Sequence, residues 1–88
     1  MERPEIIEKL KAFISQDILD GRDIGLDETT PLLEWGVINS LEIVKLLNFI
    51  QECFGIEVPI SMVVADYFRD IEAITDLVQS LAGKEAAA

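Results

Sequence analysis

The sequence predicts one all-α domain, a four-helix bundle with a long loop between its first and second helices and a short third helix. Apolar residues recur at helical spacing in three separate stretches, which is the main signal for amphipathic helices. Residues that favour the start or the end of a helix flank these stretches. The chain has 88 residues, 50% of them hydrophobic, so it is long enough for one domain and apolar enough for a packed core.

The first helix is predicted from about Pro4 to Leu19. Pro4 suits the first turn, where its missing amide needs no partner. Asp20 and Gly21 supply the turn that follows. The residues at core-facing positions of this helix are Ile6, Ile7, Leu10, Phe13, Ile14, Ile18 and Leu19.

A long loop is predicted from Gly21 to Trp35, and loops of this length are usually either functional or disordered. Residues 27–30 can cap a brief helical turn. Trp35 is interpreted as a core anchor rather than as a platform for a ligand. The apolar side chains expected to pin the loop onto the bundle are Ile24, Leu26, Leu32, Leu33 and Trp35.

The second helix is predicted from about Ser40 to Phe54, with Gly55 ending it. Asn39 and Ser40 are both favoured N-caps, because their side-chain oxygens can accept a hydrogen bond from an amide of the first turn. Composition alone therefore explains this pair as a helix start. Cys53 lies at the margin of the apolar side and is interpreted as a buried structural thiol. On a helical wheel at about 100° per residue, the apolar side consists of Ile43, Val44, Leu46, Leu47, Ile50 and Phe54.

The polar side of the second helix contains a leucine. Leu41 falls nearly opposite the apolar side, together with Lys45, Asn48 and Glu52. Single exposed leucines are common and need no functional explanation. Leu41 nevertheless lies beside the Ser40 hydroxyl at the N-terminus of the helix. A partner protein could bind the leucine side chain and modify the serine hydroxyl.

The third helix is predicted to be short. After Pro59, Ser61 is expected to cap a helical turn at residues 62–64, and Tyr67 and Phe68 are expected to return to the core.

The fourth helix is predicted to start after an N-cap at Asp70 and to end at Gly83. Residues 1–83 are expected to form the domain, and residues 84–88 a flexible C-terminal tail with no core to join. The core-facing residues of this helix are Ile71, Ile74, Leu77, Val78 and Leu81.

The charge balance excludes several classes of partner. Seventeen acidic residues against seven basic ones give a formal net charge of −10, which argues against nucleic acid and against anionic membrane surfaces. The charge fits steering toward basic patches on partner proteins and fits simple solubility equally well. No segment reaches the ~18 consecutive apolar residues of a membrane span, and the N-terminus lacks the layout of a signal peptide. A single cysteine cannot form an intramolecular disulfide and favours the cytoplasm.

Catalysis by this chain alone is not expected. The chain contains no histidine, the commonest general base, and one cysteine without histidine makes a zinc site improbable. The acidic clusters lack the spacing of a calcium loop. We therefore predict neither an active site nor a metal site.

Residues 36–42, Gly-Val-Ile-Asn-Ser-Leu-Glu, resemble the Gly-x-x-Asp-Ser-Leu motif of acyl and peptidyl carrier proteins. Residues 54–59 resemble the end of the second helix and the following loop in that family, and residues 65–71 resemble its short third helix and the entry to the fourth. The resemblance covers roughly residues 6–81, with the motifs in the expected order.

The resemblance implies that Ser40 carries 4′-phosphopantetheine, esterified from coenzyme A, with Asn39 and Leu41 beside the attachment point. Asn39 stands where the family usually has aspartate, whose charge in that family helps the modifying enzyme dock. The partner-binding residues implied by the resemblance are Leu41, Glu42, Lys45, Asn48 and Glu52.

The function implied is that of a free-standing, monomeric, cytoplasmic carrier that holds acyl or aminoacyl intermediates as thioesters, in polyketide or nonribosomal peptide biosynthesis. Its partners would be a phosphopantetheinyl transferase, an activating ligase or acyltransferase, and condensing or tailoring enzymes. The alternative is a degenerate, unmodified carrier in which Asn39 marks the loss of the attachment chemistry. Such an adaptor would dock partners through the second helix only, and would tolerate Ser40→Ala.

Overall fold

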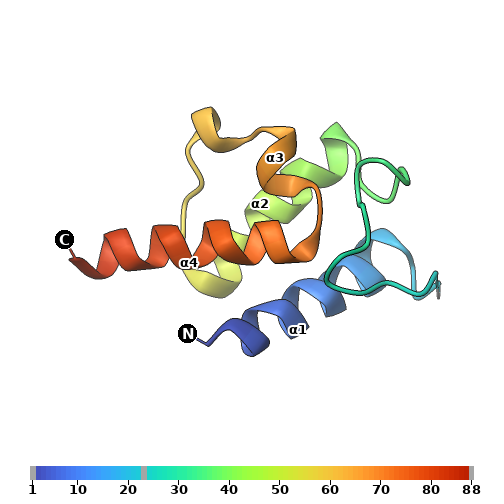
Figure 1. Cartoon of the computed structure of the whole chain (residues 1–88), viewed down its shortest axis with the longest axis horizontal. Coiled ribbons are helices and arrows are strands. Elements are labelled where there is room, and N and C mark those ends of the chain that lie inside the picture. Colours follow the sequence, from blue (N-terminus) through green and yellow to red (C-terminus); the bar gives the residue numbers. More distant parts are fainter. Residues whose placement is uncertain (1, 23, 88) are drawn as a thin grey trace.

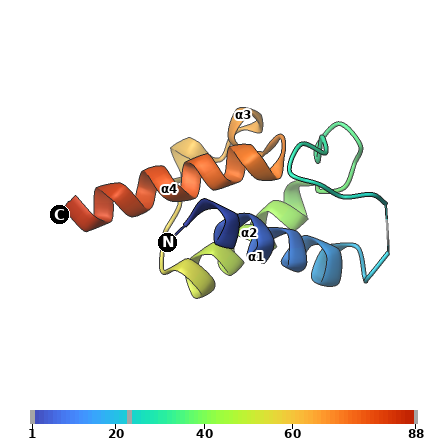
Figure 2. The same ribbon diagram turned by 60° about the horizontal axis from the view of Figure 1, so that its bottom comes forward.

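The computed structural model describes residues 2–22 and 24–87, all of whose regular secondary structure is helical. The all-α prediction is confirmed. Helices α1 and α4 run side by side, and α3 lies near the start of α4 (Figures 1 and 2). The elements in chain order are α1 (Arg3–Phe13), the π-helical turn η1 (Ile14–Ile18), α2 (Ser40–Phe54), the 3₁₀ turn η2 (Ile60–Met62), α3 (Ala65–Phe68) and α4 (Ile71–Ala87).

One aliphatic cluster, with Phe68 as its single fully buried aromatic side chain among the described residues, holds the helices together. Each large apolar side chain buried in this way contributes about 1.5–3 kcal/mol to folding. The one fully buried hydroxyl in this part of the chain, that of Thr75, donates to the carbonyl of Ile71 at 2.8 Å. The cluster includes Ile6, Leu10, Ile14, Leu32, Ile38, Leu46, Ile50, Phe68, Ile71, Ile74 and Val78.

The first helical segment ends where the sequence predicts. Pro4 lies in its first turn, and η1 continues α1 without a break. A π-helical turn bonds residues five apart, and the amide of Leu19 donates to the carbonyl of Ile14 at 2.9 Å. Both side chains therefore reach the core. Asp20 and Gly21 then adopt positive φ angles of 52° and 79°, which stops the helix.

Two backbone hydrogen bonds attach the long first loop to the segment where α3 ends and α4 begins. The amide of Leu32 donates to the carbonyl of Arg69 at 2.8 Å, and the amide of Glu72 donates to the carbonyl of Glu28 at 3.0 Å. Leu32 is completely buried, as predicted.

The brief turn predicted at residues 27–30 is present. The backbone amide and the hydroxyl of Thr29 both donate to the Asp27 carboxylate, at 2.8 and 2.9 Å, and these bonds hold the pKa of Asp27 below its usual value.

For two residues of the loop, the predicted packing against the bundle is wrong. Trp35 is 60% exposed, and Ile24 is also exposed. Gly36, at a φ of 71°, turns the chain so that Val37 and Ile38 fill the core beneath the loop in place of the indole.

The second half of the chain differs from the predictions at two short segments. Ser61 lies inside η2 and makes no capping hydrogen bond, so its predicted role as a cap is wrong. Phe68 is buried as predicted, but Tyr67 is 40% exposed. A four-residue helix can direct only part of its surface inward.

The fourth helix starts as predicted and ends later. The Asp70 carboxylate caps it by accepting from the amide of Ala73 at 2.7 Å. The end predicted at Gly83 is wrong, because α4 continues to Ala87. Glycine inside a helix costs only about 1 kcal/mol, and the Lys, Glu and Ala that follow are strong helix formers. The division into a domain over residues 1–83 and a flexible tail over 84–88 stays a prediction, and residue 88 lies outside the described residues.

Within residues 2–22 and 24–87, no helix is both long and apolar enough to cross a membrane.

Candidate functional site

The N-terminus of α2 is closed by a capping box. The Asn39 side-chain oxygen accepts hydrogen bonds from the amides of Leu41 and Glu42, at 2.9 and 3.2 Å. The Glu42 carboxylate in return accepts from the amide of Asn39 at 3.2 Å. Asn39 is therefore the N-cap, and Ser40 is the first residue of the helix.

This arrangement leaves the Ser40 hydroxyl available. Ser40 is exposed, and across the described part of the chain its hydroxyl has no hydrogen-bond partner. Buried Val37 and Ile38 hold the preceding segment against the core, so the hydroxyl is presented from a fixed backbone.

A phosphate-bearing group fits at Ser40. Ser40 is exposed, so its hydroxyl is accessible for attachment of a substituent. The positive end of the α2 dipole favours a negative charge at this position. The amides of Leu41 and Glu42 already donate to the Asn39 side chain, so these two amides are not free to bind the charged group.

The exposed side of α2 is close to the prediction. Leu41 is 64% exposed, and Lys45, Asn48 and Glu52 are exposed too. Glu42 is half-buried, and its carboxylate is engaged in the capping box.

Two predictions for the apolar side of α2 are wrong. Val44 is 54% exposed, and Cys53 is exposed rather than buried. The buried line of the helix passes through Leu46 and Ile50, on the side away from Val44. In the last turn Phe54 rather than Cys53 turns inward, and its ring meets that of Phe49 edge-on at 5.9 Å.

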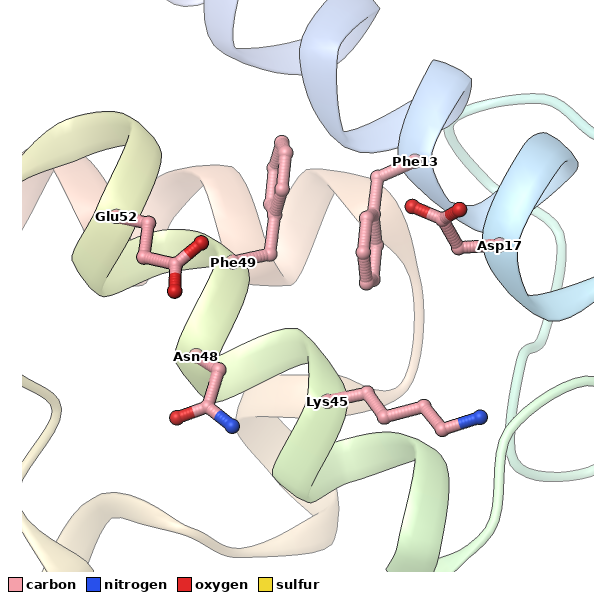
Figure 3. A pocket seen from close by; sticks show the side chains of 6 residues that line it. All are labelled: Phe13, Asp17, Lys45, Asn48, Phe49 and Glu52. Atoms are coloured by element: carbon pink, nitrogen blue, oxygen red, sulfur yellow. The ribbon is translucent and has the colours of Figure 1, made fainter.

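A hollow lies between the end of the first helical segment and α2 (Figure 3). We call it the α1–α2 groove, and its volume is about 470 Å³. The rings of Phe13 and Phe49 stack within it, with their centroids 4.3 Å apart. Its lining residues are Phe13, Asp17, Lys45, Asn48, Phe49 and Glu52.

The groove brings three of the predicted partner-binding residues, Lys45, Asn48 and Glu52, together with residues that the sequence reasoning missed. The sequence offered one sign of this groove, which is the aromatic residue Phe49 beside the polar side of α2. Its stacking partner Phe13 is 36 positions earlier in the chain and could not be paired with it from the sequence.

Among the described residues, no three His, Cys, Asp or Glu side chains gather closely enough to hold a metal ion.

Known proteins resemble this chain in sequence and in fold. Residues 8–82 match the family described as "Phosphopantetheine attachment site". The chain is 30% identical over 73 residues to "Probable acyl carrier protein PigG" of Serratia sp. (strain ATCC 39006), which covers 83% of this chain and 84% of that protein. Among solved structures, a chain in "Crystal structure of FAD-dependent dehydrogenase" is 34% identical with a TM-score of 0.76. That match covers 80% of this chain and 99% of that one.

Proposed function

The chain belongs to the phosphopantetheine-binding family of carrier proteins, and we propose that it tethers acyl or aminoacyl intermediates through Ser40. Membership of this family indicates a covalently attached 4′-phosphopantetheine group. The observation that supports the assignment to Ser40 is its exposure at the first position of α2, directly after the cap supplied by Asn39. Within residues 2–22 and 24–87 its hydroxyl has no hydrogen-bond partner.

The attachment reaction uses only the Ser40 hydroxyl of this chain. The hydroxyl oxygen forms a new bond to the phosphorus next to the pantetheine half of coenzyme A. The bond from that phosphorus to the nucleotide half breaks, and the serine proton passes to the modifying enzyme. When bound, the group supplies a flexible arm whose thiol holds an acyl group as a thioester.

The residues around Ser40 support recognition by the modifying enzyme. Asn39 keeps the size and capping bonds that aspartate would have but carries no charge. Exposed Leu41 provides an apolar contact next to the hydroxyl. The net charge of −10 draws the basic surfaces of partner enzymes toward the chain.

We place this carrier in polyketide or nonribosomal peptide biosynthesis, as a cytoplasmic monomer without catalytic activity of its own. Its partners are a phosphopantetheinyl transferase, a ligase or acyltransferase that loads the thiol, and condensing or tailoring enzymes.

The structural likeness suggests one class of tailoring partner. Because the similar chain comes from a structure described as an FAD-dependent dehydrogenase, we include such a flavoenzyme among the partners of this chain. A thioester acidifies the hydrogens on the neighbouring carbon of the acyl group. Dehydrogenation would move a proton from that carbon to a base and a hydride from the next carbon to the flavin.

The proposal is tested by intact-protein mass spectrometry after incubation with coenzyme A, Mg²⁺ and a broad-specificity phosphopantetheinyl transferase. We expect the wild type to gain the mass of one phosphopantetheinyl group and Ser40→Ala to gain none. Ser40→Ala is a matched control because Asn39 keeps the helix capped, so its thermal unfolding should equal that of the wild type.

Two results would contradict the proposal. A mass gain on Ser40→Ala would place the attachment at another residue. No gain on folded wild type with several transferases would favour the unmodified adaptor, and Asn39→Asp would then test whether the missing charge prevents modification.

A further inference from the structure

We propose that Trp35, Leu41 and Val44 form an apolar docking surface for the enzyme that modifies Ser40. We call these three residues the apolar rim. This inference rests on the proposed attachment at Ser40, and it names the side chains by which the modifying enzyme binds the chain while it reacts there.

The side chains of the apolar rim are exposed, at 60% for Trp35, 64% for Leu41 and 54% for Val44. Seven large apolar side chains are exposed across residues 2–22 and 24–87, and these three lie within five positions of Ser40. Single exposed apolar residues need no explanation, but apolar side chains gathered at one place mark an interaction site.

On α2, the apolar rim lies beside the reacting hydroxyl. Leu41 follows Ser40 directly. Val44 lies one turn further along the same flank as Ser40, because residues four apart on a helix have Cβ atoms about 5–6 Å from each other. The modifying enzyme brings a phosphorus atom into bonding distance of the Ser40 oxygen, so its surface covers Leu41 and Val44 at that moment.

Trp35 is presented by a turn with a fixed backbone. The amide of Gly36 donates to the carbonyl of Leu33 at 3.2 Å, and Gly36 has a φ of 71°. The amide of Val37 donates to the carbonyl of Leu32 at 2.8 Å. These two bonds form a Schellman motif directly after Trp35. Figures 1 and 2 show this turn next to the start of α2, so the indole is held near Ser40 and little backbone entropy is lost when a partner binds it.

The charges around Ser40 favour apolar contacts. Between Trp35 and Val44 the only charged residue is Glu42, which is half-buried and accepts a hydrogen bond from the amide of Asn39. Asn39 itself is neutral. The net charge of −10 therefore attracts a basic enzyme from a distance, whereas close contact at Ser40 depends on the burial of apolar surface.

The apolar rim also defines the complementary surface of the enzyme. Tryptophan is among the residue types that most often dominate the binding energy of a protein interface, and such residues insert into well-packed pockets. We expect the enzyme to present an apolar cleft next to its active site. Trp35 inserts into this cleft, and Leu41 and Val44 pack against its edge.

The test is the steady-state kinetics of modification by the transferase, with coenzyme A and Mg²⁺ in excess and this chain as the varied substrate. Trp35→Ala should raise KM about tenfold or more, and Val44→Ala should raise it to a smaller extent. The kcat should stay nearly unchanged, because a docking contact is made equally in the bound complex and in the transition state. Trp35→Phe should restore most of the binding.

Two controls separate docking from folding and from charge. Ile60→Ala removes another exposed apolar side chain, in η2 away from the start of α2 (Figure 1), and should leave KM and kcat unchanged. Thermal unfolding of Trp35→Ala and Val44→Ala should stay close to that of the wild type, since both side chains are exposed. The ratio of variant to wild-type KM should be the same in about 0.01 and about 0.15 M NaCl, because salt screens charges but not apolar contacts.

The outcomes separate this inference from the proposed function. If Ser40 is modified but KM is unchanged in Trp35→Ala and Val44→Ala, the enzyme docks elsewhere. A fall in kcat at unchanged KM would mean that these residues position the serine, and a KM effect that disappears at the higher NaCl concentration would assign docking to charges. Each of these results overturns the inference and leaves Ser40 as the attachment point, whereas failure of the wild type to gain mass overturns both.

Discussion

At the N-terminus of α2, the capping hydrogen bonds come from Asn39, and among the described residues the hydroxyl of Ser40 has no hydrogen-bond partner. Asparagine and serine are about equally favoured as caps, so residue type alone places the start of the helix there without assigning the two roles. The available sequence signal was Glu42, three residues after Asn39, which is the spacing of a capping box. The reciprocal bond from the Asn39 amide to Glu42, three residues on, decides the assignment.

This assignment makes a prediction about stability. Asn39→Ala should lower the free energy of unfolding by about 1 kcal/mol, because two amides of the first turn lose their acceptor. Asn39→Asp should retain the wild-type stability, since a carboxylate accepts the same bonds and its charge interacts favourably with the helix dipole. Urea unfolding followed by circular dichroism measures the difference. If Ser40→Ala were as destabilising as Asn39→Ala, serine would be the cap.

Trp35 and Cys53 show the limit of residue-level prediction. Both residue types are commonly buried to a large degree, and both are exposed here. Whether a given side chain is buried depends on which neighbours reach it. At Trp35 the deciding feature is the positive φ of Gly36, which lets Val37 and Ile38 occupy the core instead.

At the scale of the elements, the existence of the helices could be predicted from spacing, but the direction that α2 faces could not. A helical wheel averages over all apolar residues, including those whose side receives no neighbour. The stacking of Phe49 on Phe13 draws one flank of α2 toward the first helical segment. Val44, on a different flank, is left exposed.

Paired substitutions in α2 test this orientation. Val44→Ala should change the free energy of unfolding by less than about 0.5 kcal/mol, because the side chain is exposed and alanine is the better helix former. Leu46→Ala should lower it by about 2–5 kcal/mol, because Leu46 is completely buried and its truncation leaves a cavity. Both values come from urea unfolding curves with unchanged slopes. Similar costs at the two positions would show that α2 faces the core as the wheel predicted.

At the scale of the whole molecule, the proposed attachment site at Ser40 follows from the sequence, whereas the α1–α2 groove could not be predicted from it. The attachment motif is contiguous, over residues 36–42, so its residues are neighbours in any fold. The groove combines Phe13 and Asp17 with residues of α2 that follow the long loop, and only tertiary packing brings them together.

The net charge of −10 is also a property of the whole molecule. The distance over which its charges interact can be compared with the size of the fold. The Debye length is about 30 Å at 0.01 M salt and about 8 Å at 0.15 M. The radius of gyration is 12.2 Å, so at low salt nearly every charge acts on every other, and at 0.15 M only near neighbours do. Arg3 pairs with Glu72 and Asp76 across α1 and α4, but the chain has far more acidic residues than its seven basic ones can neutralise.

We therefore expect NaCl to have opposite effects on stability and on recognition. Raising NaCl from about 0.01 to about 0.15 M should raise the urea midpoint, because screening the repulsion among carboxylates outweighs weakening the exposed ion pairs of Arg3. The same change should slow modification by a basic transferase, since the attraction that steers the encounter is screened as well. Glu34→Gln, at an exposed carboxylate of the first loop, should reduce the salt effect on stability. A urea midpoint that falls with salt would mean that the Arg3 ion pairs, rather than the surplus of negative charge, control the electrostatic stability of the fold.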